Sequence, residues 1–526
     1  MIALAALTGP VPKAGVVIVA LLAAVVLLGG AGHGPRARAL AMLGALALSP
    51  VLLLTDIWNS PQLHIVHRHP LEAVVGAAVV VAALLGAAAL LVRRPWLVAP
   101  LAVLALPFRI PIATGGTTAN LLVPLYFVVA AAALAWIYGT FRAPAPAARP
   151  APAARPAPTA GPAPAPARSG DLVDWVVRLL ALYIVLYGIQ AWYSPKFEQA
   201  LQNMVFFYVP FALLLAFLRA LEWNRRLLRE CLRITLALAI VFSLIGFFEY
   251  ATKTTILSTK LLIANELHTY FTVNSVFLDP DIFGRYLALA IILIAVTLIY
   301  DFPQRQQAVV SVVLALLWSC LVLTLSRSSL GALLVGLAVL AALRWKPGRA
   351  LVVAVVVVAL GAAAVALSPT TFGLNQGLNG ASSGRGGLVS GGLSLFGDRP
   401  VWGYGSGSFV TEYRAHRRRT GTSLSASHTI PITVGAEQGI IGEIVYLAFV
   451  ISAILCVVRG SRGDPARSAI AAAFVALVFH TLLYADFLED PTTWVLLGIG
   501  LALAAAPSAV SPAPRATAVS RYSGVV

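Results

Sequence analysis

The chain has 526 residues, of which 60% are hydrophobic and only 11% are charged. Soluble globular domains carry about 25% charged residues, so this composition excludes that class. The formal charge of +17 at pH 7 raises nucleic acid as a partner. The distribution of charge along the chain, given below, indicates membrane topology instead, and we expect no nucleic-acid partner.

Apolar runs long enough to cross a membrane recur from one end of the chain to the other. The runs are continuous rather than alternating, which argues against an outer-membrane barrel, and helices satisfy their own backbone groups in lipid. We therefore expect an all-α integral membrane protein with about 12–15 transmembrane helices and one long extracytoplasmic loop. The first apolar run is not followed by a small-residue cleavage site and a polar mature sequence. We therefore expect a retained helix rather than a signal peptide. The expected spans lie near 14–31, 37–54, 71–92, 95–109, 119–140, 171–190, 203–220, 230–250, 284–300, 307–325, 328–344, 350–367, 437–458, 467–485 and 491–506.

These spans sort the charges onto two sides of a membrane when the N-terminus is placed outside. The inside then receives 23 Lys and Arg with 6 Asp and Glu, and the outside receives 14 of each kind. The whole net charge of +17 therefore lies inside, as the positive-inside rule requires. We expect a multi-pass membrane protein whose basic side faces the cytoplasm.

A Pro/Ala-rich tract at 142–170 divides the chain into two helical parts. Proline fixes φ and lacks an N–H, so this tract is expected to be a semi-extended cytoplasmic linker. We expect an N-terminal membrane block of about five spans at 1–141 and a membrane core at 171–506. The core includes an extracytoplasmic loop at 368–436, and a disordered cytoplasmic tail follows at 507–526.

Three segments on the outside are long enough to carry a site, at 55–71, 252–283 and 368–436. Arg327 faces the same side from the tight turn of "LTLSRSSLGALLVGL", where "SRSS" alone separates two spans. One interpretation is that Arg327 reaches lipid head groups. The other is that packed helices hold its planar guanidinium for phosphate oxygens.

Arg285 begins a span directly after "LDPDIFG". Asp279 or Asp281 is expected to cap that helix. An Asp-X-Asp pair also occurs in metal–nucleotide clamps, but the outside of a membrane offers no pool of nucleotide sugars.

The long loop supplies Arg385, then "GYGSGSF", then the basic "YRAHRRR". The glycines predict a tight turn in which the backbone approaches something closely, not a dinucleotide fingerprint. The simpler interpretation of the basic run is a solvated face or a contact with lipid head groups.

His428 follows in "SASHTIPITVGAEQGIIGEIVYLAF", before the next span. A lone histidine is more often structural, but this one shares its side with Arg327 and Arg385 and can take a proton near neutral pH. Glu437 and Glu443 flank it and are candidates to orient or tune it.

Four of these stretches, in this order, resemble the O-antigen ligase and polymerase superfamily: "FLDPDIFGRYLALA", "TLSRSSLGALLVGL", "GRGGLVSGGLSLFGDRPVWGYGSGSF" and "SHTIPITVGAEQGIIGEIVYLAF". The resemblance covers roughly residues 275–450. Thr429 stands where the family commonly has Asn, and Asp279-Pro280-Asp281 stands where it has Asn-Pro-Asn. About twelve spans are usual, so the N-terminal block is partly additional.

The resemblance implies a multi-pass glycosyltransferase of the bacterial inner membrane that moves a glycan from undecaprenyl diphosphate to a hydroxyl acceptor at the outer leaflet. Arg327 and Arg385 are similar to the family's diphosphate-binding arginines, Arg285 is a weaker candidate, and His428 is similar to its essential histidine. With Glu437, His428 forms the predicted catalytic pair. We expect inversion at the anomeric carbon, no cofactor and no metal.

Two alternatives remain open in the sequence. A polymerase would use a second lipid-linked glycan as the acceptor. A polytopic lipid or polysaccharide transporter would need charges near mid-membrane, whereas the candidate charges gather at one face. The sugar and the acceptor are not determined by the sequence.

Overall fold

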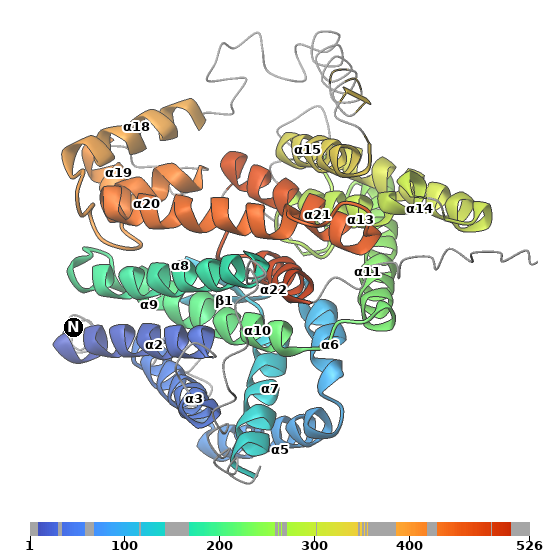
Figure 1. The fold of residues 1–526 in the computed structure, drawn as a ribbon. Helices are drawn as coiled ribbons and strands as arrows, with labels where there is room; N and C mark the ends of the chain where they lie inside the picture. The colour runs from blue at the N-terminus through green and yellow to red at the C-terminus, as the bar shows by residue number, and fades with distance from the viewer. Residues whose placement is uncertain are drawn as a thin grey trace, which may run out of the picture.

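The computed structural model shows a bundle of helices (Figure 1). It describes residues 9–29, 34–57, 68–114, 117–142, 168–257, 271–300, 302–345, 385–417, 429–484 and 486–506, with the isolated positions 261, 265, 348–349, 352 and 355. The linker at 143–167, most of the span expected near 350–367, the loop residues 368–384 and the tail at 507–526 lie outside the described residues.

The helices before the linker are α2 (Pro10–Leu28), α3 (Pro35–Ile57), α5 (Pro70–Arg93), the short η2 (Pro95–Leu97), α6 (Val98–Ala105) and α7 (Val123–Arg142). After it come α8 (Arg168–Gln190), η3 (Ala191–Tyr193), α9 (Phe197–Asn203), the π-helical turn η4 (Met204–Tyr208), α10 (Val209–Ala220), α11 (Arg225–Thr252), α13 (Pro280–Ile299), α14 (Gln304–Leu323), α15 (Arg327–Arg344), α18 (Arg385–Asp398), α19 (Phe409–Arg417), α20 (Ile430–Val458), α21 (Pro465–Leu483) and α22 (Pro491–Ala505).

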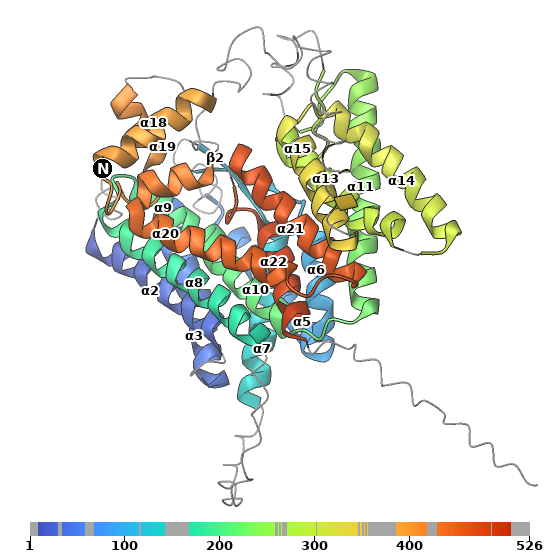
Figure 2. The same ribbon diagram turned by 45° about the horizontal axis from the view of Figure 1, so that its top comes forward.

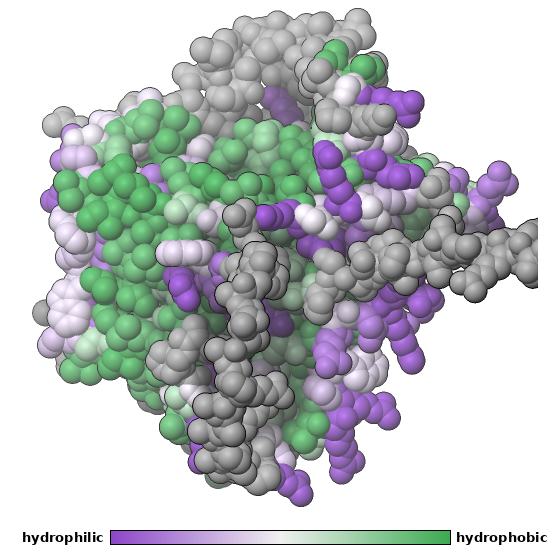
Figure 3. All heavy atoms as spheres, in the orientation of Figure 1, coloured by the Kyte–Doolittle hydropathy of each residue, from purple (hydrophilic) through white to green (hydrophobic). Residues whose placement is uncertain are grey.

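Twelve helices among the described residues are long and apolar enough to cross a membrane, which confirms the predicted all-α integral membrane protein. Two shorter apolar helices, Pro95–Ala105 and Pro491–Ala505, fall on two further expected spans. Figure 3 shows hydrophobic residues forming a broad continuous area on one face of the molecule, as a lipid-facing surface requires.

The span expected near 95–109 is wrong in extent, because α6 ends at Ala105. Pro107 and Pro111 follow it, and proline can neither donate to a helical turn nor tolerate a helical residue before it. The chain instead forms an antiparallel hairpin of β1 (Ile110–Thr114) and β2 (Thr117–Leu121), the only strands in the described part of the chain.

The span expected near 437–458 begins earlier, at Ile430, so it takes in the end of the expected loop 368–436. Its axis breaks at Gly439, where φ is 65° and ψ is −167°. A Cβ built at Gly439 would lie 2.3 Å from the carbonyl oxygen of Val401, so only glycine permits this approach of the 400–407 backbone.

Three helices begin at an Asp-Pro pair that explains their positions. Asp279, Asp464 and Asp490 each accept a hydrogen bond from a backbone N–H in the first turn of α13, α21 and α22. The proline that follows occupies the first helical position, where an N–H would have no partner. Asp279 is therefore the cap of α13, one of the two capping candidates in the sequence.

The two parts of the chain pack together in the bundle. From the N-terminal part, α2 packs against α8 and α10, and α6 packs against α11. In the core, α20 lies between α8 and α21, and α21 packs against α13 and α15. Figure 2 shows α11, α13, α14 and α15 standing together at one edge. The boundary between block and core at the linker stays a prediction.

Candidate functional site

Several helix connections meet at one end of the bundle, which we call the loop end: residues 190–197, 271–281, 324–329, 385–417, 429–438 and 484–490. Gln190 at the end of α8 donates to the carbonyl of Gln438 (3.1 Å), and Tyr484 after α21 donates to Asp279 before α13 (2.8 Å). At the same end, the ammonium of Lys13 near the start of α2 lies 6.0 Å from the ring centroid of Phe197 in α9. The loop end therefore collects the segments that the charge distribution assigns to the outside.

The turn between α14 and α15 is held by serines on both sides of Arg327. Ser326 caps α15 by accepting from the N–H of Ser329 (3.2 Å). The Asp281 carboxylate accepts from the hydroxyls of Ser326 (2.5 Å) and Ser328 (3.0 Å). Arg327 begins α15, and its side chain is exposed. A fixed backbone thus presents a guanidinium at a helix N-terminus, which already favours anions.

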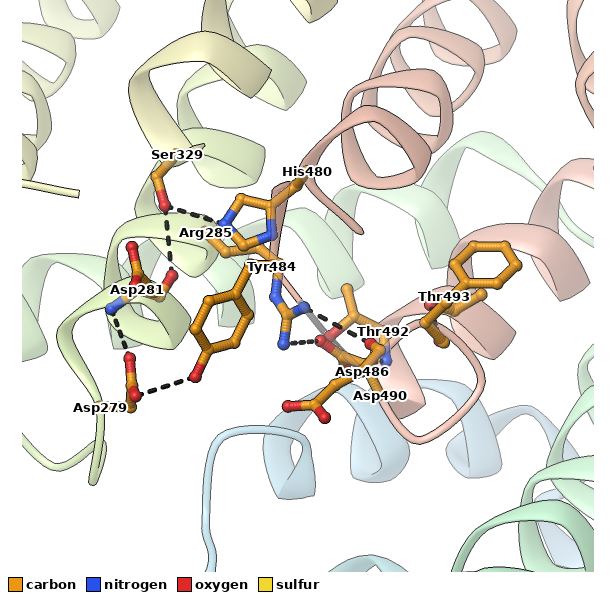
Figure 4. A network of polar contacts seen from close by, with 11 residues as sticks. Asp279, Asp281, Arg285, Ser329, His480, Tyr484, Asp486, Asp490, Thr492 and Thr493 are labelled. Carbon is orange, nitrogen blue, oxygen red and sulfur yellow. Dashed lines mark hydrogen bonds and ion pairs between the residues drawn. The ribbon is translucent and has the colours of Figure 1, made fainter. Parts of the chain in front are cut away.

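Asp279 connects the start of α13 to the turn after α21 (Figure 4). One carboxylate oxygen accepts from the N–H of Asp281 (2.7 Å) and the other from the Tyr484 hydroxyl (2.8 Å). Burial raises the pKa of the Asp279 carboxyl, and the nearby charge of Asp281 adds to the rise. The pair Asp279 and Asp281 is therefore engaged in capping α13 and in holding the serine turn.

Arg285 lies one turn into α13 and points toward the start of α22 (Figure 4). Its guanidinium forms an ion pair with Asp490 at 2.5 Å, and it donates to the carbonyl of Asp486 at 3.5 Å. The two side chains are only 3% and 4% exposed. The buried ion pair links α13 to the start of α22, and its burial keeps the Arg285 charge away from the surface.

His480 near the end of α21 is a buried residue that the sequence analysis did not single out. Its Nε2 lies 3.2 Å from the Ser329 hydroxyl, which also donates to the Asp281 carbonyl (3.2 Å). These contacts tie α21 to the serine turn (Figure 4). The acid-rich turn "YADFLEDP" between two apolar spans was the available sequence signal for Tyr484, Asp486 and Asp490.

Glu437 is buried in α20, and both of its carboxylate oxygens accept backbone hydrogen bonds. They come from the N–H of Gly407 (2.8 Å) and of Phe409 (3.0 Å). The Glu437 carbonyl accepts a third from Gly405 (2.7 Å). In this geometry Glu437 fastens the loop to α20, a structural use of the carboxylate that its spacing from His428 did not reveal.

The glycine turn of "GYGSGSF" makes the close approach that its sequence predicts. Its backbone lies against the backbone of other segments of the same chain. Gly403, Gly405 and Gly407 all have positive φ. A Cβ built at Gly405, where φ is 100°, would lie 2.6 Å from the Cα of Ser194. Glycine is required because two backbones touch here.

Arg285 and Arg327 lie near the same end of the bundle. Asp281, in the same helix as Arg285, accepts hydrogen bonds from Ser326 and Ser328 on either side of Arg327. Arg385 begins α18, but its side chain is outside the described atoms, and His428 is outside the described residues. Thr429, directly after His428, donates to the carbonyl of Leu482 at the end of α21 (3.1 Å). This contact anchors the chain next to His428 near the turn that carries Tyr484.

No group of three His, Cys, Asp or Glu side chains within the described part of the chain is arranged to hold a metal ion. Metal independence therefore stays a prediction that chelation can test.

Residues 311–447 match the family model described as O-antigen ligase. The chain contains an O-antigen ligase domain. This domain begins in α14, ends in α20 and includes Arg327, Arg385, His428 and Glu437, while Arg285 precedes it. The resemblance to the O-antigen ligase superfamily is confirmed, and no curated protein matches the chain. The domain and the twelve apolar helices mark a multi-pass bacterial membrane enzyme of O-antigen assembly, of the ligase or polymerase type.

Proposed function

We propose that this protein transfers a glycan from undecaprenyl diphosphate to a hydroxyl acceptor at the outer leaflet of the inner membrane. The observation that carries the proposal is the turn between α14 and α15, where Asp281 and the serines fix the backbone around the exposed Arg327. Lipid-linked diphosphates lie at the membrane boundary. A guanidinium at a helix N-terminus there is suited to bind one.

The diphosphate is the leaving group in the proposed reaction. As the bond between the anomeric carbon and the diphosphate oxygen breaks, the electron pair and negative charge move onto that oxygen. Arg327 and Arg385 stabilise this charge, which favours the transition state. Arg285 is proposed to act indirectly, because its guanidinium is paired with Asp490 inside the protein.

His428 is the proposed base. The acceptor oxygen attacks the anomeric carbon from the face opposite the diphosphate, its proton moves to His428, and the configuration inverts. Glu437 is proposed to position the segment between α18 and α20 rather than to exchange protons, since backbone N–H groups occupy both carboxylate oxygens.

The active side is proposed to be extracytoplasmic, on the basis of the charge distribution. Single cysteines placed near Ser382 and near Thr159 test this with a membrane-impermeant thiol reagent on intact cells. Labelling near Ser382 only supports the assignment. Labelling near Thr159 only overturns the outer-leaflet mechanism.

The enzymatic test uses the purified full chain in detergent with a defined undecaprenyl-diphosphate glycan and analyses the products by mass spectrometry. A glycolipid with a free hydroxyl and a second lipid-linked glycan are offered separately as acceptors. Glycosylated glycolipid indicates a ligase, and a lengthened carrier-linked glycan indicates a polymerase.

Three variants give this assay its controls. Arg327→Ala and His428→Ala should abolish transfer. Arg305→Ala, at the start of α14 and the opposite end of the bundle, removes an exposed arginine of the same kind and should keep the wild-type rate. The proposal is wrong if Arg327→Ala and His428→Ala transfer the glycan as fast as Arg305→Ala.

A further inference from the structure

A cavity of about 630 Å³ lies at the end of the bundle opposite the loop end, where α5, α6 and α7 meet α10 and α11. Its walls include Trp96, Trp136 and Phe217, and its polar lining includes Glu222 and Arg226. The rings of Trp136 and Phe217 lie 5.9 Å apart. The volume is in the range of pockets that hold small molecules, about 300–1,000 Å³.

The helix ends around the cavity, which we call its rim, carry more arginines than acidic residues. Four helices end or begin here, α5 at Arg93, α7 at Arg142, α10 at Ala220 and α11 at Arg225. The arginines at these helix ends are Arg93, Arg94, Arg142, Arg225, Arg226 and Arg229. Two acidic side chains line the same cavity, Glu222 and Glu230, and Glu230 is already paired with Arg233 at 2.8 Å. The six arginines outnumber these two glutamates, so the rim carries net positive charge, and Arg226 is the arginine among them that lines the cavity itself.

Apolar walls beneath a basic rim, at the level where membrane helices end, match the two chemical parts of a phospholipid. Tryptophan side chains are common at this depth of a bilayer, where one edge of the ring is apolar and the other is wet. Basic side chains at the membrane surface attract anionic lipids.

We propose that this cavity binds one anionic phospholipid, with an acyl chain against Trp136 and Phe217 and the head-group phosphate at Arg226. The protein's own linker is the rival occupant, because it starts where α7 ends. It carries Arg149 and Arg155 and no acidic residue between 143 and 167, so the basic rim disfavours it. A lipid in this position fills the joint between the N-terminal helices and the core.

Gly139 offers a way to fill the cavity without disturbing the fold. It lines the cavity from α7, and a Cβ built there meets nothing within 4 Å. Gly139→Leu places a side chain in the space, and leucine is a better helix former than glycine. Gly86→Leu is the matched control, because Gly86 is exposed in α5, lies outside the cavity lining and has equally open space.

The experiment is native mass spectrometry of the full chain purified in a mild detergent, combined with thermal unfolding in the presence of added phosphatidylglycerol or phosphatidylcholine. Wild type and Gly86→Leu should retain one phospholipid per chain and unfold at a higher temperature with phosphatidylglycerol than with phosphatidylcholine. Gly139→Leu should lose the retained lipid and the shift. Arg226→Gln should lose the preference between the two lipids.

Equal retention by Gly139→Leu and Gly86→Leu would overturn the proposal, as would wild type that retains no lipid. An equal response of wild type to both lipids would overturn the anionic head group. A lipid shift that appears only after deletion of residues 143–167 would identify the linker as the occupant. None of these measurements depends on the transferase reaction.

Discussion

Replacing Arg285 by methionine tests whether its charge stabilises the protein or binds the substrate. In the wild type the guanidinium lies 2.5 Å from Asp490, with the two side chains 3% and 4% exposed. The variant leaves the Asp490 carboxylate buried without its cation. Breaking a buried pair on one side costs about 3–5 kcal/mol. Arg285→Met should therefore unfold at a markedly lower temperature than wild type.

The double variant Arg285→Met with Asp490→Asn removes both charges. Asparagine is as good a helix cap as aspartate, so the N–H of Thr492 keeps its acceptor at the start of α22. Replacing both members of a buried pair is often neutral. The remaining loss is the hydrogen bond to the Asp486 carbonyl, about 1 kcal/mol. Most of the stability should return.

Thermal unfolding in detergent and the rate of glycan transfer are measured on both variants. If Arg285 acts only through the ion pair that links α13 to α22, the double variant regains stability and glycan transfer together. If Arg285 binds the diphosphate, the double variant is stable and inactive. A single variant Arg285→Met within about 1 kcal/mol of wild type would refute the reasoning, because the cost of one unpaired buried charge is larger.

Four further predictions follow from other parts of the loop end. Gly405→Ala should lower the unfolding temperature of the purified protein and the yield of folded protein, because its Cβ would lie 2.6 Å from the Cα of Ser194 at a φ of 100°; an unchanged temperature would contradict the close approach. Arg327→Lys should reduce the rate of glycan transfer although the charge is kept, since the bidentate guanidinium is lost. Transfer by the wild type should continue in EDTA. Activity that disappears with EDTA and returns with magnesium or manganese would favour a metal ion at the site. Asp281→Asn should slow transfer with little change in unfolding temperature, because it loosens the serine turn around Arg327; a wild-type rate would argue against this role. Burial, reinforced by neighbouring acidic groups, raises the pKa of the Glu489 carboxyl. The folded state therefore binds this proton more tightly than the unfolded state, and the stability of the protein falls as pH rises from the unfolded pKa toward the folded one. Glu489→Gln should stabilise the protein at pH 8 more than at pH 5, and an equal effect at both pH values would contradict the raised pKa.

The sequence alone located the membrane helices because hydrophobicity is a local property. A run of about twenty apolar residues must cross the bilayer as a helix whatever its neighbours are. Asp-Pro pairs likewise mark helix starts, because the cap and the first turn are adjacent in the chain. The ordered motifs around Arg327, Arg385 and His428 were enough to indicate the ligase superfamily.

Prolines and a glycine in the sequence shift two helices away from the positions that hydrophobicity predicts. Pro107 and Pro111 ended α6 early, yet the apolar run continued past them and suggested a full span. Gly439 broke the axis of α20 while the helix began seven residues before its expected start. In both cases backbone geometry, rather than hydrophobicity, decided where the helix lies.

Tertiary structure decided which side chains are used inside the protein and which face the surface. Arg285 and Arg327 have similar settings in the sequence, each at the start of a span. Only the fold brings Asp490, 205 positions away, against Arg285, whereas Asp281 holds the serines and leaves Arg327 at the surface. Glu437 lies near His428 in the sequence, but only the fold shows that two loop N–H groups bind its carboxylate. Charge and spacing are written in the chain, but the partner that neutralises a buried charge comes from a distant segment, and packing alone selects it.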